Sequence, residues 1–214
     1  MKQSRFVQLL VLSLVVSLPA WAQLRSSAGG AAGASQVVVG FTGGSVWTSA
    51  TTGICIWYFP VAGDLDPTSL FAPGSSGAPV MDRAHSYLLW VSDFSVQVLP
   101  TSIGFLALAP AGEGTIYYSG NPTARDFSDL TKRSTWGAPV ATFMREASLV
   151  RSSDNLATDT FIFSADLALS EAFSLNGIPF NFRSLIPHGM TCFEWGQNQS
   201  VWEAGNCIAT GSGR

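Results

Sequence analysis

The sequence predicts an all-β protein: one antiparallel β-sandwich of Greek-key or jelly-roll type with one short helix, preceded by a cleaved signal peptide. Two observations predict the fold class. Short β-rich segments alternate with clusters of Gly, Pro, Asn and Ser, which is typical of sandwiches and barrels rather than of alternating βα units. No long segment carries the 3.6-residue period of an amphipathic helix, and no internal repeat indicates a propeller or solenoid.

The first 22 residues have the composition of a secretory signal peptide. Lys2 and Arg5 precede the apolar residues 6–18, and the small-residue site Ala20-Trp21-Ala22 follows. Because the apolar core is too short to span a bilayer, we expect cleavage after Ala22 and a mature protein that is secreted or periplasmic. Residues 23–35 are rich in Gly, Ala and Ser and predict a flexible leader. Residues 36–214 are then expected to form a single domain.

The β-rich segments place the candidate strands in order along the chain. We expect strands at residues 36–41, 53–59, 86–91, 95–99, 103–108, 115–118, 140–144 and 147–150. In residues 161–169 the polar Ser164 and Asp166 lie opposite an alternating apolar set, which is Phe161, Phe163, Ala165, Leu167 and Leu169. One face of that strand is therefore expected to be buried and the other to face water.

Local signals predict one hairpin and one helix. Asn176-Gly177 lies inside residues 173–182 and suits a type I′ turn, in which both central residues have positive φ. Pro179 has no N–H to donate, which predicts an edge strand. A helix is expected at residues 121–131, where Asn121 is a candidate N-cap followed by proline, and where Phe127 and Leu130 have i, i+3 spacing.

Charge and composition exclude one class of partner. Charged residues make up 12% of the chain and the net charge is −3. Removal of the signal peptide takes away Lys2 and Arg5, which leaves nine basic against fourteen acidic residues and a net charge of −5. Nucleic-acid binding needs a concentrated cationic surface. We therefore expect no nucleic-acid partner, and no membrane span once the signal peptide is cleaved.

The three cysteines predict one disulfide in an exported protein. Of the three possible pairings we expect Cys192 with Cys207, because this pair closes a short loop late in the chain. Cys55 lies in the apolar residues 54–59 and is expected to remain a free, buried thiol.

The segment between these two cysteines contains the candidate ligand-binding residues. Glu194 adjoins Trp195, Trp202 adjoins Glu203, and His188 lies just upstream. Aromatic rings can stack on sugar faces while carboxylate and amide groups bind hydroxyls, so we single out Trp195, Trp202, Glu194 and His188. The alternative, which we favour for any large aromatic residue, is that both tryptophans pack onto the sheet.

Signals for metal binding or catalysis are weak. His188, Cys192 and Glu194 do not have the spacing of a zinc site, and Asp64, Asp66 and Asp82 do not form a calcium loop. The chain contains no Gly-x-Ser-x-Gly motif, and its two histidines, His85 and His188, belong to no nucleophile motif. We expect neither a metal nor a cofactor, and no catalytic residue is assigned.

These observations favour a non-catalytic exported module for extracellular binding or structural roles, with a carbohydrate, surface polymer or extracellular protein as partner. One alternative is an exported hydrolase of an extracellular polymer that uses Glu194 or His188 as acid or base. The second alternative is a surface assembly subunit that pairs through an exposed sheet edge. Because one fold can host many functions, fold class alone does not decide among the three.

Overall fold

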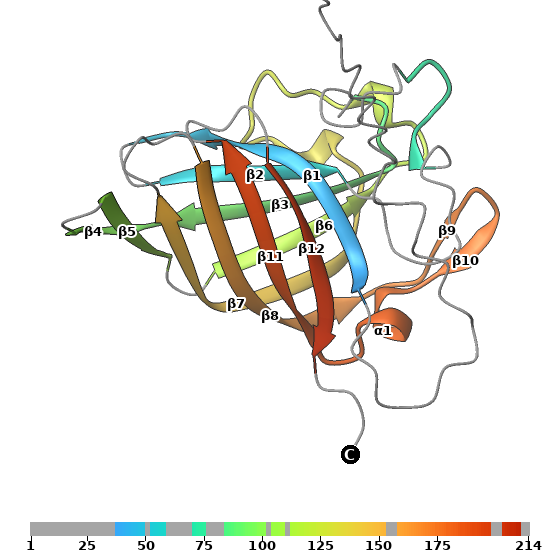
Figure 1. Ribbon diagram of the computed structural model, residues 1–214. Helices are drawn as coiled ribbons and strands as arrows, with labels where there is room; N and C mark the ends of the chain where they lie inside the picture. The colour runs from blue at the N-terminus through green and yellow to red at the C-terminus, as the bar shows by residue number, and fades with distance from the viewer. Residues whose placement is uncertain are drawn as a thin grey trace, which may run out of the picture.

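The computed structural model describes residues 37–49, 52–58, 70–75, 84–101, 104–109, 112–152, 158–197 and 203–210. Its main element is one antiparallel sheet (Figure 1). The strands of this sheet are β1 Val37–Trp47, β2 Thr52–Tyr58, β3 Leu88–Ser95, β4 Gln97–Thr101, β5 Gly104–Ala109, β6 Gly112–Tyr118, β7 Ala138–Ser152, β8 Thr158–Ser170, β11 Gly189–Gln197 and β12 Glu203–Thr210. Their order is β4-β5-β7-β6-β3-β2-β1-β12-β11-β8. The all-β prediction is therefore confirmed.

The sheet closes into a barrel of eight strands, so the predicted sandwich is wrong. Closure comes from β7, which pairs with β6 and β5 along one side and with β8 along the other. Paired residues can be followed once around the barrel: Ala141, Ile116, Trp90, Trp57, Gly43, Glu203, Gly196, Asp159 and Ser152. This path returns to β7 eleven residues after its start, which is the stagger that tilted barrel strands require.

Sandwiches and barrels have the same alternating residue pattern along each strand, and only long-range pairing separates them. Residues 140–144 and 147–150, predicted as two strands, form the single fifteen-residue β7. Two irregularities in its register against β8 let this long strand curve around the barrel. The closure of the sheet therefore depends on a strand whose length the local pattern did not indicate.

An aromatic cluster fills the barrel at the level of Trp90. The Trp90 ring centroid lies 6.0 Å from that of Phe41, 5.8 Å from that of Phe143 and 5.6 Å from that of Phe163. All four side chains are buried in one core cluster. The barrel at this level is thus a packed core, as is usual for eight strands.

The predicted hairpin lies at one end of the barrel. β9 Phe173–Leu175 pairs with β10 Ile178–Phe180, and the turn residues Asn176 and Gly177 have φ of 52° and 82°. This confirms the prediction of positive φ at both positions. With the short helix α1 Phe182–Leu185, the hairpin packs on the core through Leu175 and Phe182 (Figure 1). Pro179 lies in a two-stranded sheet, where each strand is an edge.

The predicted helix at residues 121–131 is wrong. The segment contains a 3-10 turn at Pro122–Ala124, and a second one follows at Arg133–Thr135. Asn121 makes no side-chain cap. Downstream, the Asp126 carboxylate accepts from the Ser128 N–H at 2.8 Å, and that of Asp129 from the Thr131 N–H at 3.0 Å. Such local side-chain hydrogen bonds favour turns over helix. Hydrogen bonds from the side chains of Ser128 and Thr131, and then from their backbone N–H groups, lower the pKa of Asp126 and Asp129 respectively.

This irregular segment covers one outer face of the barrel. Trp136, with Phe127 and Leu130 packed against it, lies over the outward residues of β2 and β3, which are Ile54, Ile56, Leu89 and Val91. Arg125 anchors the segment by donating hydrogen bonds to the carbonyls of Trp136, Ser86 and Tyr87. Burial lowers the pKa of Arg125 to about 10, so its guanidinium is still charged at neutral pH.

Within the described residues the main sheet has a single open edge, the outer side of β4, at the barrel end opposite the β9–β10 hairpin (Figure 1). The register pairs Thr101 with Gly104 beside a two-residue connection, and such a pair is hydrogen-bonded. Along an antiparallel ladder, hydrogen-bonded pairs alternate with pairs that are not hydrogen-bonded to each other. Val98 and Pro100 belong to the second kind, so their backbone groups point away from β5. Pro100 has no N–H, and a proline on an edge strand hinders pairing with another chain.

We expect Pro100→Thr to make the protein self-associate, because the substitution adds an outward N–H on the open edge. Sedimentation velocity over a hundredfold range of concentration would measure the effect. Leu99→Thr is the matched control, since the backbone of Leu99 already faces β5 in this register. If Pro100→Thr sediments as the parent protein does at every concentration, the assigned role of Pro100 is wrong.

Candidate binding face

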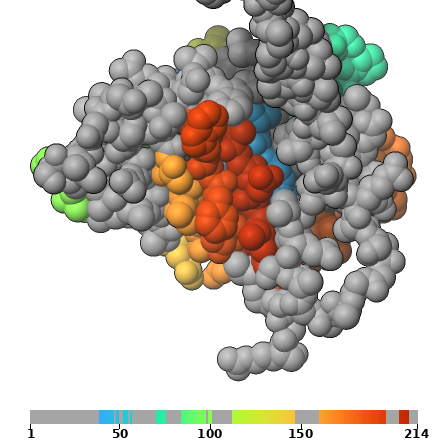
Figure 2. Space-filling view, viewed as in Figure 1, coloured from blue at the N-terminus to red at the C-terminus, as the bar shows by residue number. Residues whose placement is uncertain are grey.

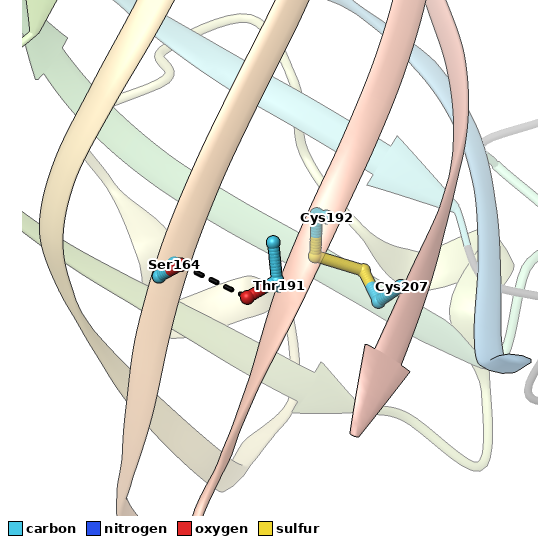
Figure 3. Close-up of a disulfide and its surroundings, with 4 residues drawn as sticks. All are labelled: Ser164, Thr191, Cys192 and Cys207. Atoms are coloured by element: carbon cyan, nitrogen blue, oxygen red, sulfur yellow. Dashed lines mark hydrogen bonds between the residues drawn. A yellow bond between two sulfur atoms is a disulfide. The ribbon is translucent and has the colours of Figure 1, made fainter. Parts of the chain in front are cut away.

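The predicted disulfide between Cys192 and Cys207 is confirmed. The two residues lie directly opposite each other on β11 and β12, with Cα atoms 4.0 Å apart, and both side chains are fully buried (Figure 3). The bond therefore joins two neighbouring strands from inside the barrel. A binding site on the outer face of β11 and β12 would therefore lie on two strands that the disulfide holds together.

Strand alternation separates the candidate residues that are adjacent in sequence. Glu194 follows Cys192 by two residues, shares its inward face and is 6% exposed, whereas Trp195 faces outward and is 46% exposed. His188 precedes β11, is exposed and accepts a backbone hydrogen bond from Leu167. Six residues of extended chain put it about 20 Å from Glu194. Trp202 lies outside the described residues.

Glu194 and Arg145 are the buried charged side chains that face the barrel interior in the described part of the chain. Arg145 lies against β6, since a Cβ added to Gly112 would meet its guanidinium at 2.8 Å. Buried charges destabilise a fold unless the surrounding groups compensate them, and these two have opposite sign. Both residues belong to the interior and do not reach the outer face.

Nine outward residues of β8, β11 and β12 form a grid that we name the aromatic face. Its three rows are Ser164-Thr191-Ile208, Ile162-Phe193-Asn206 and Thr160-Trp195-Ala204, each made of residues directly opposite one another. Phe193 is 49% exposed and Trp195 46%. Figure 2 shows these three strands exposed on one side of the barrel. None of the nine residues is charged.

Polar groups surround the two rings. The hydroxyls of Ser164 and Thr191 are 2.9 Å apart and hydrogen-bonded, in the row next to Phe193 (Figure 3). Asn206 is opposite Phe193 and Thr160 is opposite Trp195. Each ring is therefore adjacent to a hydroxyl or an amide, and the face offers apolar stacking and neutral hydrogen bonds together.

Trp195 was predicted from the sequence, whereas Phe193, Ile162 and Asn206 were not. Alternation along Thr191, Phe193 and Trp195, opposite Cys192 and Glu194, was a readable signal for Phe193. Ile162 and Asn206 join the face through cross-strand register, which depends on pairing between distant segments. No local signal was able to place them there.

The fold and the aromatic face together define the class of protein: a β-barrel with an exposed, uncharged aromatic surface. Comparison with protein-family models, curated protein sequences and solved structures finds no match. Within the described residues, no three His, Cys, Asp or Glu side chains are grouped as metal ligands would be. No helix in the same residues has the length and apolar character needed to cross a membrane.

Proposed function

We propose that this protein is an exported, non-catalytic module that binds an extracellular partner on the aromatic face. One observation carries the proposal: Phe193 and Trp195 are about half exposed on adjacent outward positions of one strand. Large aromatic residues are normally buried, and exposed groups of them mark interaction sites. The disulfide on the inner side of the same strands holds β11 and β12 together, so the face is preorganised for binding.

The other apolar outer face of the barrel supports this assignment by contrast. Ile54, Ile56, Leu89 and Val91 lie on an outer face too, but Trp136 and its neighbours cover them and they are buried. On the aromatic face, Ile162, Phe193 and Trp195 are each at least 37% exposed. The fold thus buries one apolar outer face with its own chain and leaves another accessible to a partner.

The hydrolase alternative has less support. Acid and base catalysis needs two titratable groups within reach of the same bond. Glu194 is buried inside the barrel, whereas His188 is exposed six residues earlier in the chain, just before β11. The two side chains are therefore too far apart to act on one bond. A ligand in the centre of the barrel is also disfavoured, because Trp90, Phe143 and Phe163 fill the interior there.

Capture of extracellular material tests the proposal. The mature protein would be immobilised and exposed to the culture supernatant and envelope fraction of its exporting host. We expect it to retain a component that the double variant Phe193→Ser and Trp195→Ser retains at least tenfold less, since each lost aromatic contact weakens binding by about 1 kcal/mol.

The matched control is Ile178→Ser, which removes an apolar side chain that is 51% exposed on the β9–β10 hairpin. It should capture as much as the parent protein. Thermal unfolding of all variants would establish that they remain folded. Equal capture by the double variant and the parent would exclude the aromatic face as the binding site.

A further inference from the structure

We infer that the partner bound by the aromatic face is an extended, uncharged glycan chain. This inference rests on the proposed function, since it names the chemistry of the partner at the same site. It follows from the side-chain composition, the charge, the size and the shape of the face.

The composition of the face matches a sugar chain. A pyranose ring has an apolar C–H face, which stacks on aromatic rings, and an edge of hydroxyl groups, which both donate and accept hydrogen bonds. Phe193 and Trp195 provide two rings, on residues whose Cα atoms are about 7 Å apart along β11. Ser164, Thr191 and Asn206 provide neutral donors and acceptors in the adjacent positions.

The charge of the face selects among glycans. None of its nine residues is charged, and the acidic residue in line with them on the outward side of β8, Asp166, is exposed two positions beyond Ser164. An acidic polysaccharide would find one cationic position at the margin of the face, Arg151 of β7 opposite Thr160, and would be repelled by a protein of negative net charge. A neutral chain does not incur this repulsion.

The size of the face argues against a protein partner or a second copy of this chain. With strands about 4.8 Å apart and about 3.4 Å per residue, the grid measures about 10 Å by 14 Å between its outer Cα atoms. A stable protein interface needs roughly 800 Å² on each side. An area this small suits a narrow chain laid across it.

The shape of the face favours a chain over a small molecule. Small ligands bind in concave sites that surround most of their surface. Each of the three rows crosses three neighbouring strands of one sheet. The outer side of such a sheet is an open surface and does not enclose a ligand. A polymer makes up for shallow contact by touching several positions in succession.

Affinity electrophoresis of the mature protein tests the inference. The neutral probes are hydroxyethyl cellulose, laminarin and dextran, and the acidic probes are alginate and polygalacturonate. We expect at least one neutral polymer to retard the protein, both acidic polymers to leave its mobility unchanged, and binding to persist in high salt. Retardation by no neutral polymer, or by the acidic ones preferentially, would overturn the inference.

Single variants distinguish stacking with hydrogen bonding from simple apolar adhesion. Trp195→Ala should weaken binding of the neutral polymer about tenfold, and Trp195→Phe should restore most of it. Asn206→Ala removes the amide opposite Phe193 without removing apolar surface, and should weaken binding about fivefold. An unchanged affinity for Asn206→Ala would contradict glycan recognition, because an apolar contact does not use the amide.

The material captured in the earlier experiment separates failure of this inference from failure of the proposed function. Destruction of the captured component by periodate, which cleaves vicinal diols, supports the glycan. A component that resists periodate and is destroyed by protease, with capture still dependent on Phe193 and Trp195, leaves the binding face in place and overturns the glycan. Capture that is independent of both residues overturns both proposals.

Discussion

Replacing both Cys192 and Cys207 with alanine is expected to lower the free energy of unfolding by about 3 kcal/mol. The disulfide closes a loop of fifteen residues, and a cross-link over such a loop lowers the entropy of the unfolded chain by about that amount. Both side chains are fully buried, so the alanines also remove packed sulfur atoms from the core. Urea unfolding, followed by tryptophan fluorescence, would measure the difference.

The response to a reductant provides the control for this prediction. The parent protein should lose stability when it is unfolded in the presence of dithiothreitol, and the double alanine variant should not respond. Cys55→Ala removes one cysteine but leaves the bridge, so it should respond as the parent does. A Cys55→Ala variant whose stability no longer depends on dithiothreitol would contradict the Cys192–Cys207 pairing, because it would mean that Cys55 takes part in the stabilising bridge.

Trp136→Ala is expected to destabilise the fold by about 3–5 kcal/mol, the usual range for truncating a fully buried tryptophan. Trp136 is inaccessible to solvent and lies between Tyr117 and Phe127, with ring centroids at 6.1 and 5.8 Å. Its Nε1 also donates to the Asp126 carbonyl at 2.9 Å. The substitution removes the side chain that joins residues 119–137 to the outer face of β2 and β3, so that segment should unfold first.

Trp195→Ala is the matched control, because it removes the same side chain from a position that is 46% exposed. It should change the free energy of unfolding by less than about 1 kcal/mol, in keeping with a surface substitution. Hydrogen exchange would show whether the Trp136 variant loses protection mainly in residues 119–137. Equal destabilisation by the two variants would contradict the distinction between the covered face and the aromatic face.

Several features were predictable because they depend on neighbouring residues alone. The turn at Asn176-Gly177 requires only two residues that tolerate positive φ. The buried face of β8 follows from alternation at Phe163, Ala165 and Leu167, whereas Leu169, predicted on the same face, is 41% exposed near the end of the strand. The disulfide was predictable because Cys192 and Cys207 are close in sequence, so the loop between them costs less entropy to close than a longer loop to Cys55 would.

The helix predicted at residues 121–131 shows where local reasoning was insufficient. Asn121, Pro122 and the spacing of Phe127 and Leu130 are genuine helix signals, yet the Asp126 and Asp129 carboxylates bind backbone N–H groups two residues ahead. The apolar outer face of β2 and β3 then provides a surface for Phe127, Leu130 and Trp136. Tertiary burial of these side chains prevailed over a modest local propensity.

Local sequence also misled the prediction that Glu194 and Trp195 belong to one binding site. The two are adjacent in sequence, but a strand directs consecutive side chains to opposite faces. One lies inside the barrel and the other on its surface. The residues that accompany Trp195 come from β8 and β12 instead, and their register is a property of the closed sheet.

The sequence by itself determined the all-β class, the strand faces, the β9–β10 turn and the disulfide, because these depend on alternation, turn chemistry and short-range closure. Only the tertiary structure decided that the sheet closes on itself and that residues 119–137 cover one outer face of the barrel. It also decided that nine residues from three strands form the exposed aromatic face. Those outcomes depend on which distant strands pair and in which register. In an antiparallel sheet, strands with similar alternation can pair in several orders, and the complete set of contacts selects one of them.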